Sequence, residues 1–260
     1  MGLTLAPYTP GTCCLCGAAQ NLTGEHKIKA SAIRSEFGTG DTLAIRRFGE
    51  TADRLRYAQS PKSKAFHFEA RLCHACNSER TQGTDLEFDR FHAAAKSLLG
   101  EGRDPREVFL DSRYAQGSEP YLKVFRYFAK LLCCHTADVG APRRIHVANF
   151  ALGSASANCV WLSIDEDWTY RQAASELGPF QYAAHGGLVV YGDKETGNAN
   201  AFHSSLTIGA VRYVFFSRLN WLERLELKFG YPEFYQWCRA NVAAAKDAPL
   251  SDEERLALGL

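Results

Sequence analysis

The sequence predicts an α+β fold built from two consecutive regions, residues 1–111 and 112–260. In the first region, two Cys-x-x-Cys pairs lie on either side of short strand and helix signals. In the second region, the pattern changes to a long helix, four strand-like runs and two closing helices. The junction carries too little Gly- or Pro-rich punctuation to predict that the two regions fold independently.

The first region predicts a hairpin followed by a helix. Its elements are expected at 21–25 (strand), 30–36 (short helix), 41–58 (extra strands or irregular structure) and 66–72 (strand). A longer helix is expected over 77–99, where Phe88 and Phe91 share helical spacing with other apolar residues. An interruption at 83–85 predicts two pieces or a kink, and two glycines and a proline in 100–105 end the helix.

The second region predicts one helix, antiparallel strands and two C-terminal helices. An amphipathic helix is expected over 121–132, with Pro120 just before its start. The strand-like runs are 145–150, 159–164, 187–191 and 205–216, the last with a bend at Gly209. The closing helices, 219–229 and 233–245, carry aromatic residues that are interpreted as core: Trp221, Phe234, Tyr235 and Trp237. The polar tail, 247–260, is expected to be peripheral.

Four cysteines have the spacing of a closed tetrahedral zinc site: Cys13 and Cys16, then Cys73 and Cys76. Each short pair presents two sulfurs to the same ion, so the site would clamp two distant chain segments together. Four thiolates leave no open coordination position, which predicts a structural rather than a catalytic zinc ion. Cys14 offers an alternative ligand in the first pair, although only Cys13 has the two-residue gap to Cys16.

Three further residues complete a pattern that resembles a known nuclease superfamily. Glu25 and His26 lie between the two pairs, and Asn77 directly follows the second pair. In this order, the motifs resemble the HNH (ββα-metal) superfamily, in the subgroup whose zinc knuckles support the catalytic hairpin. The resemblance covers residues 10–95 and implies that the first region, 1–111, is a zinc-stabilised ββα-metal module.

The resemblance also assigns roles to these residues. It implies that Glu25 and Asn77 bind a catalytic divalent ion and that His26 is the general base. Two features depart from the family. No Asn occurs shortly before Cys73, and the Pro and Gly that often follow the acid-His pair are replaced by Lys-Ile-Lys-Ala-Ser over 27–31.

Phosphodiester hydrolysis requires a general base and a cation near the phosphate. A neutral His26, with a reference pKa of about 6.5, can accept a proton from water. Mg²⁺ or Mn²⁺ held by Glu25 and Asn77 would keep coordination positions open for phosphate oxygens. Adjacent strand residues point to opposite faces, so Glu25 and His26 serve one site only where the strand ends or bulges. Thr23-Gly24, immediately before them, favours such a distortion.

Each residue also has an alternative interpretation. Glu25-His26 could be a surface pair, and Asn77 could be a helix N-cap. His67 and His74 are secondary candidates for catalytic residues. His67 is expected on the second hairpin strand, and His74 inside the second Cys-x-x-Cys pair, here called the second knuckle.

The charge distribution favours nucleic acid near the hairpin only. The formal net charge of +1 gives no general signal. Between His26 and Arg71, ten basic residues stand against five acidic ones, which suits contacts to a phosphate backbone. The candidate contacts are Lys27, Lys29, Arg46, Arg47 and Arg71. Residues 111–260 carry 15 basic and 16 acidic residues, so their role stays open between target selection, homodimer assembly and regulation by a partner protein.

Other sequence features predict a cytoplasmic protein without membrane contact. No run of eighteen apolar residues occurs, and residues 1–10 do not have the pattern of a secretory signal. The nine cysteines fit a reducing compartment. Four of them lie in apolar contexts and are expected to pack as small hydrophobic residues: Cys133, Cys134, Cys159 and Cys238.

The sequence therefore predicts a metal-dependent HNH endonuclease acting on DNA, with RNA as an open alternative substrate. By association with the superfamily, a restriction or phage-defence role is expected. Two functions of other classes remain as alternatives. One is a non-catalytic zinc-ribbon module that binds nucleic acid, and the other is a thiol oxidoreductase that uses the Cys-x-x-Cys pairs.

Overall fold

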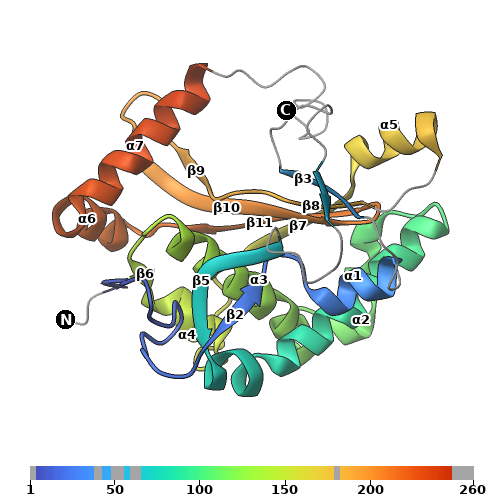
Figure 1. Ribbon diagram of the computed structural model, residues 1–260, viewed down its shortest axis with the longest axis horizontal. Coiled ribbons are helices and arrows are strands. Elements are labelled where there is room, and N and C mark those ends of the chain that lie inside the picture. Colours follow the sequence, from blue (N-terminus) through green and yellow to red (C-terminus); the bar gives the residue numbers. More distant parts are fainter. Residues whose placement is uncertain (1–3, 38–42, 48–55, 59–65, 179–181, 248–260) are drawn as a thin grey trace.

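A seven-stranded sheet runs through the middle of the computed structural model, which describes residues 4–37, 43–47, 56–58, 66–178 and 182–247 (Figure 1). The strand order is β4-β3-β8-β10-β11-β7, and β9 also pairs with β10. The strands are β3 (Leu43–Arg47), β4 (Arg56–Ala58), β7 (Trp161–Glu166), β8 (Tyr182–His185), β9 (Val189–Gly192), β10 (Ala199–Ile208) and β11 (Val211–Arg218). The pairings are antiparallel except that of β3 with β8, which is parallel. The mixed α+β class is confirmed.

Two small ribbons lie beside this sheet. β1 (Leu5–Ala6) pairs with β6 (Arg143–Arg144), and β2 (Leu22–His26) pairs with β5 (His67–Cys73). The second ribbon is the hairpin expected from the sequence, and it lies on the side of the large sheet that also carries most of the helices (Figure 1).

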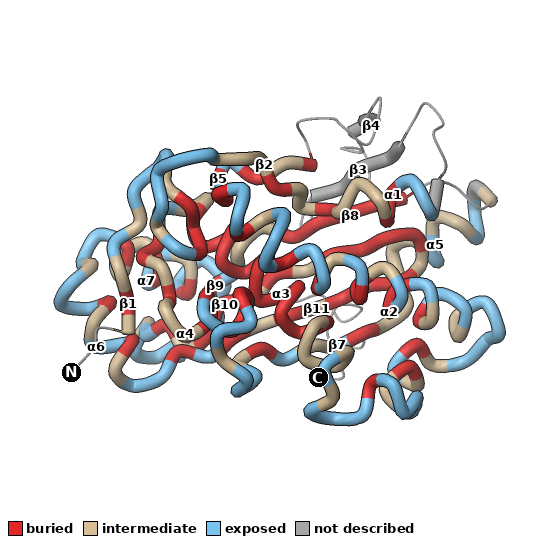
Figure 2. Tube along the Cα trace, turned by 90° about the horizontal axis from the view of Figure 1, so that it is seen from below, coloured by how far each residue is buried: buried red, intermediate tan, exposed pale blue. Residues whose placement is uncertain are grey.

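The helix α3 (Glu119–Asp138) is the centre of the molecule. Ser118 caps its first turn by accepting a hydrogen bond from the Tyr121 amide, and Pro120 lies inside that turn. Every residue from Val124 to Ala137 is buried, as the red stretch of α3 in Figure 2 shows. An amphipathic helix was expected here. The helix is instead covered all round, because the sheet, α2, α4 and the strand β5 each contact it.

The remaining helices surround α3 and the sheet. They are α1 (Ala30–Phe37), η3 (a π-helix, Ala75–Arg80), α2 (Gln82–Gly100), η4 and η5 (short 3₁₀ helices, Pro105–Leu110 and Ser112–Tyr114), α4 (Ile145–Ala151), α5 (Trp168–Leu177), α6 (Trp221–Gly230) and α7 (Pro232–Asp247). In Figure 1, α7 lies on the opposite side of the sheet from α3. None of the helices among the described residues is long and apolar enough to cross a membrane.

One hydrophobic core crosses the boundary at residue 111. Phe88 of α2 stacks on Tyr127 of α3 with ring centroids 4.0 Å apart, and it also meets Tyr213 of β11. A second, smaller core lies between α6, α7 and the strands β9 and β10, around Phe202 and Cys238. The boundary at residue 111 therefore marks a change of sequence pattern across which the main core is continuous.

Several expected elements differ in the structure. The run 145–150, expected as a strand, forms the helix α4, because Val147 and Ala151 are buried at helical spacing against α3. A short apolar run does not distinguish the two structures by periodicity alone. The helix after the second knuckle divides at Thr81 instead of 83–85. The run 205–216 belongs to the hairpin of β10 and β11, in which Gly209 has φ +59° as first residue of the tight turn.

Two interpretations of the C-terminal residues have different outcomes. Phe234 is buried in the smaller core as expected, whereas Trp221 is 62% exposed, so its interpretation as a core residue is wrong. The polar tail was expected from residue 247, and 248–260 lie outside the described residues.

Candidate metal centre and hairpin site

The four cysteines of the two Cys-x-x-Cys pairs come together. Their sulfur atoms all lie within 4.8 Å of one another, which is close enough to hold a metal ion and is compatible with zinc. The first pair lies in a tight loop after β1, where the Gly17 amide donates to the Cys13 carbonyl at 2.8 Å. The second pair spans the end of β5 and the first turn of η3. The cluster therefore joins the first knuckle to the hairpin.

The thiols of Cys13 and Cys76 are joined by a hydrogen bond. The Cys76 thiol donates a hydrogen bond to the Cys13 sulfur, and backbone amides of the knuckle add to this effect. Together they lower the pKa of Cys13, while the same hydrogen bond raises the pKa of Cys76, so these two thiols share a proton that a metal ion would displace. Cys14, the alternative ligand, points elsewhere, because its sulfur lies 3.6 Å from the buried Cys134 sulfur. The geometry selects Cys13 as the ligand.

The hairpin is distorted at Glu25. Gly24 is paired with Arg71, but the next registered pair is His26 with His67. Glu25 thus faces the three residues 68–70 of β5, and the ladder is interrupted there. The distortion expected from Thr23-Gly24 is confirmed. The interruption falls at Glu25, directly before His26, and a regular strand would direct these two residues to opposite faces.

Glu25 is buried and bound to the central helix. Its Oε1 atom lies 3.0 Å from Nζ of Lys130, and the same ammonium group lies 2.6 Å from Oδ1 of Asp85. Lys130 is only 1% exposed. Burial alone would lower the pKa of Lys130, but the two carboxylates raise it well above its ordinary value, so the group is a buried cation.

His26 lies against His67 on the other side of the distortion. The two ring centroids are 4.0 Å apart. Burial, with the positive charges of His67, Arg34 and Lys130, lowers the pKa of His26 to about 4. The imidazole is therefore neutral at pH 7 and carries an unprotonated nitrogen that can accept a proton.

Asn77 is fixed to the strand that carries Glu25 and His26. Its Nδ2 donates to the Gly24 carbonyl at 3.1 Å and to the Thr23 hydroxyl at 3.0 Å. The Thr23 hydroxyl itself donates to the Leu72 carbonyl, so it must accept from Asn77. This network holds the amide nitrogen of Asn77 against the strand. The N-cap interpretation of Asn77 is wrong, because the residue lies inside η3 and His74 occupies the cap position.

The basic residues proposed as DNA contacts lie in different environments. Lys27 lies 3.9 Å from Asp138 and over the Phe68 ring, and Lys29 pairs with Asp89 at 2.6 Å. Arg71 is exposed, and its guanidinium group lies close to Gly24. A Cβ atom added at Gly24 would be 3.3 Å from the Arg71 guanidinium. The strand β3 contains Arg46 and Arg47, whose side chains lie outside the described residues.

The secondary histidines occupy the expected elements. His67 begins β5, and His74 lies between the two cysteines of the second pair. The His74 side chain is exposed, with Nδ1 at 3.6 Å from Glu79. His67, in contact with the His26 ring, is the histidine that adds to the site.

Lys130 and Asp85 are neighbours of Glu25 that the sequence pattern does not identify. A signal was present for Lys130, because this cation lies in the middle of an apolar helix that also contains Tyr127 and Leu131. A lysine in such a position needs a carboxylate partner when the helix is buried. The identity of that partner depends on tertiary structure, since Glu25 is more than a hundred residues away.

No protein-family model, curated protein or solved structure matches this chain.

Proposed function

We propose that this protein is a metal-dependent HNH endonuclease that hydrolyses phosphodiester bonds in DNA. The observation that carries the proposal is the distortion of the hairpin at Glu25. It allows a carboxylate and a neutral imidazole to serve one site, and Asn77 is hydrogen-bonded to the same strand. These three groups are the donor and base set that the resemblance to HNH nucleases implies.

The proposed zinc ion has a structural role. Cys13, Cys16, Cys73 and Cys76 supply four sulfur donors, the set typical of closed tetrahedral sites. The ion would hold the first knuckle against the end of β5 and the start of η3. Nine free thiols in the chain support a reducing compartment, for which we propose the cytoplasm.

Glu25 and Asn77 are the residues that would hold the catalytic Mg²⁺ or Mn²⁺. Both offer oxygen donors, which these hard cations prefer. The two hydrogen bonds of the Asn77 amide nitrogen leave its Oδ1 atom for the ion. Lys130 contacts Oε1 of Glu25, which leaves Oε2 as the ligand atom. A bound divalent ion would offset negative charge on the phosphate during bond cleavage.

His26 acts as the general base in this proposal. It accepts a proton from a water molecule, whose oxygen forms a bond to phosphorus while the bond from phosphorus to the 3′ oxygen breaks. The 3′ oxygen keeps the electron pair of that bond and takes a proton from solvent water. Burial lowers the pKa of His26, which keeps the ring unprotonated at neutral pH and also makes it a weaker base than a free imidazole. Its contact with His67 restricts the orientation of the ring.

Phosphate contacts are assigned first to Arg71, which is exposed beside the distorted strand. Arg46 and Arg47 remain candidates on β3. Lys27 and Lys29 form ion pairs with Asp138 and Asp89, so we consider them weaker candidates for DNA contacts than Arg71. The resemblance suggests a restriction or phage-defence role, and a homodimer or a regulatory partner fits that role.

A plasmid nicking assay tests the function directly. Purified protein is incubated with supercoiled plasmid, with and without Mg²⁺ or Mn²⁺, beside the variants His26→Ala and His74→Ala. We expect metal-dependent nicking by the wild type and by His74→Ala, and a loss on the order of a hundredfold or more for His26→Ala. Equal cleavage by wild type and His26→Ala would reject the mechanism. The same assay with a labelled RNA identifies the preferred nucleic acid.

The ion pair between Glu25 and Lys130 favours one alternative function. If Lys130 stays paired with Glu25, the carboxylate does not bind a catalytic ion. The chain would then be a zinc-ribbon module that binds nucleic acid without cutting it. That function predicts DNA binding without nicking at any divalent-ion concentration. A thiol oxidoreductase predicts titratable thiols and no metal, so stoichiometric zinc by elemental analysis would exclude it.

A further inference from the structure

The helix α6 presents an unusual face to solvent. Its exposed residues recur at helical spacing and form one stripe, here called the α6 face: Trp221, Arg224, Leu225, Lys228 and Phe229. Trp221 is 62% exposed and Phe229 is 74% exposed. Three large apolar side chains on one exposed helix face indicate a binding surface more often than a solvated one.

The two acidic residues of α6 are both bound by other parts of the chain. Glu223 is fully buried, completes a capping box with Asn220 and accepts hydrogen bonds from the Arg144 guanidinium at 2.7 and 3.0 Å. Glu226 accepts from the backbone amides of Thr4 and Leu5. The α6 face therefore combines two cations with three apolar groups. The partly exposed Glu226 lies beside Leu225 and Phe229, but the amides of Thr4 and Leu5 bind its carboxylate, so the face favours an anionic partner with apolar parts.

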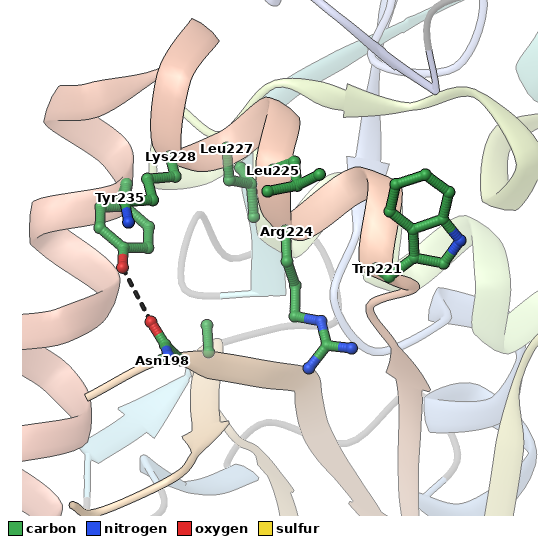
Figure 3. A pocket seen from close by; sticks show the side chains of 8 residues that line it. Asn198, Trp221, Arg224, Leu225, Leu227, Lys228 and Tyr235 are labelled. Atoms are coloured by element: carbon green, nitrogen blue, oxygen red, sulfur yellow. Dashed lines mark hydrogen bonds between the residues drawn. The ribbon is translucent and has the colours of Figure 1, made fainter. Parts of the chain in front are cut away.

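A pocket of about 350 Å³ lies beside this face, between α6, the start of β10 and α7. Figure 3 shows Trp221 at one end and Lys228 with Tyr235 at the other, with the Arg224 side chain between them. The Tyr235 hydroxyl donates to Oδ1 of Asn198 at 2.8 Å, so polar groups line the wall opposite α6. The pocket lining contains no carboxylate.

We propose that the α6 face and this pocket bind a nucleotide segment of the DNA strand, at a place separate from the hairpin. This inference rests on the proposed function and adds a second DNA contact to it. Bases stack on exposed aromatic rings such as Trp221, and the phosphates that join them pair with Arg224 and Lys228. The surface is open along the helix, whereas sites for small molecules bury most of their ligand, so we assign it to a polymer.

The α6 face is connected to the zinc knuckle by two neighbouring arginines. Arg143 donates to the Leu15 carbonyl, inside the first Cys-x-x-Cys pair, at 3.0 Å. Arg144 holds Glu223 of α6 and also donates to backbone carbonyls at the end of β11. A strand bound on α6 would thus be held in a fixed position relative to the hairpin. The α6 face is expected to contribute to affinity and not to the chemical step.

Fluorescence anisotropy with a labelled single-stranded DNA oligonucleotide tests the inference, without added divalent ion. Full-length wild type is compared with Trp221→Ala and Lys228→Ala. Two matched controls remove exposed groups elsewhere: Leu110→Ala on η4 and Arg171→Ala on α5. We expect each α6 variant to weaken binding about tenfold, with a shallower salt dependence for Lys228→Ala, and the controls to bind like wild type. Circular dichroism checks that the fold is unchanged.

The outcomes separate this inference from the nuclease assignment. If Trp221→Ala and Lys228→Ala bind the oligonucleotide like wild type while plasmid nicking persists, the inference is overturned and the nuclease assignment stands. If wild type does not nick DNA but the α6 variants still lose binding, the α6 contact stands and the nuclease assignment is overturned.

Two more measurements identify the occupant. Competition by a free mononucleotide at concentrations comparable to the oligonucleotide would overturn the assignment to a polymer. Sedimentation velocity of wild type and Trp221→Ala detects a second copy of the chain on this face, and a dimer that Trp221→Ala dissociates would also overturn the inference.

Discussion

Lys130 of the central helix forms a buried ion pair with Glu25 of the hairpin, with 3.0 Å between Nζ and Oε1. The same ammonium group binds Asp85 at the start of α2, so three separate elements meet at one cation. This contact ties the acidic residue of the proposed catalytic set to the second region of the chain. It has consequences for stability and for the function of the hairpin.

Lys130→Met is predicted to destabilise the whole protein. The substitution leaves Glu25 and Asp85 buried without their cation, and removing one partner of a buried ion pair costs about 3–5 kcal/mol. Chemical denaturation measures the loss in the free energy of unfolding. The triple variant Lys130→Met, Glu25→Gln, Asp85→Asn should recover part of it, because neutral amides do not need a cation. Unchanged stability of Lys130→Met would show that the ion pair does not form.

Cys76→Ser is predicted to lose zinc and much of its stability. Metal binding in four-cysteine sites is coupled to folding, with apparent binding energies of about 10–16 kcal/mol in small zinc domains. Because the main core is continuous across residue 111, we expect the loss to lower the melting temperature of the entire chain. Elemental analysis and calorimetry measure both effects.

Cys14→Ser is the matched control for this zinc prediction. It changes a thiol next to a proposed ligand, but the Cys14 sulfur lies against Cys134 and outside the cluster. Full zinc occupancy is expected for Cys14→Ser. Zinc loss in this variant together with zinc retention in Cys76→Ser would require a different ligand set.

Asn77→Ala is predicted to affect both the hairpin and its metal dependence. It removes two hydrogen bonds to β2, each contributing on the order of 1 kcal/mol, so we expect about 1–3 kcal/mol of destabilisation. It also removes an oxygen donor, so nicking should require a higher Mg²⁺ concentration. Thr23→Val separates the two effects, because it removes the hydrogen bond from Asn77 to the Thr23 hydroxyl and the bond from that hydroxyl to the Leu72 carbonyl, and leaves the Asn77 oxygen in place. Wild-type metal dependence of Asn77→Ala would remove Asn77 from the ligand set.

Local sequence signals were sufficient for much of the candidate site. The cysteine spacing predicted the cluster because ligand geometry is encoded in short segments. Thr23-Gly24 predicted the distortion at Glu25 because Gly in a strand often accompanies a bulge. Both features depend on residues close together in sequence.

Features that depend on distant contacts could not be predicted in this way. The partner of Glu25 lies on α3, and Lys130 is identified as that partner only when the hairpin packs on the helix. The run 145–150 forms α4 because α3 offers an apolar surface to it. Trp221 has the spacing of a core residue, but the buried face of α6 is set by Glu223 and Leu227 instead. Tertiary packing decided each of these outcomes.

The pH dependence of stability is predicted to include a contribution from His135. This histidine is buried in the core, its Nε2 lies 3.0 Å from the Ser204 hydroxyl, and the edge of its ring contacts Phe68. Burial, with the charges of His185 and Lys27, holds the pKa of His135 well below 6.5 in the folded protein. Between that low value and about 6.5, the unfolded chain binds a proton that the folded protein does not bind.

Stability should therefore fall as the pH drops below about 6.5, by up to about 1.4 kcal/mol for each pH unit from this group. Buried carboxyls with raised pKa, such as Asp138, act in the opposite direction, so the wild-type slope alone does not isolate the histidine. The measurement is urea denaturation at several pH values between 7 and 5 for wild type and His135→Gln, which cannot titrate. His74→Gln, at an exposed position, is the control. A smaller decline for His135→Gln than for the other two proteins is expected, and parallel curves for all three would show that His135 is protonated equally in the folded and unfolded states.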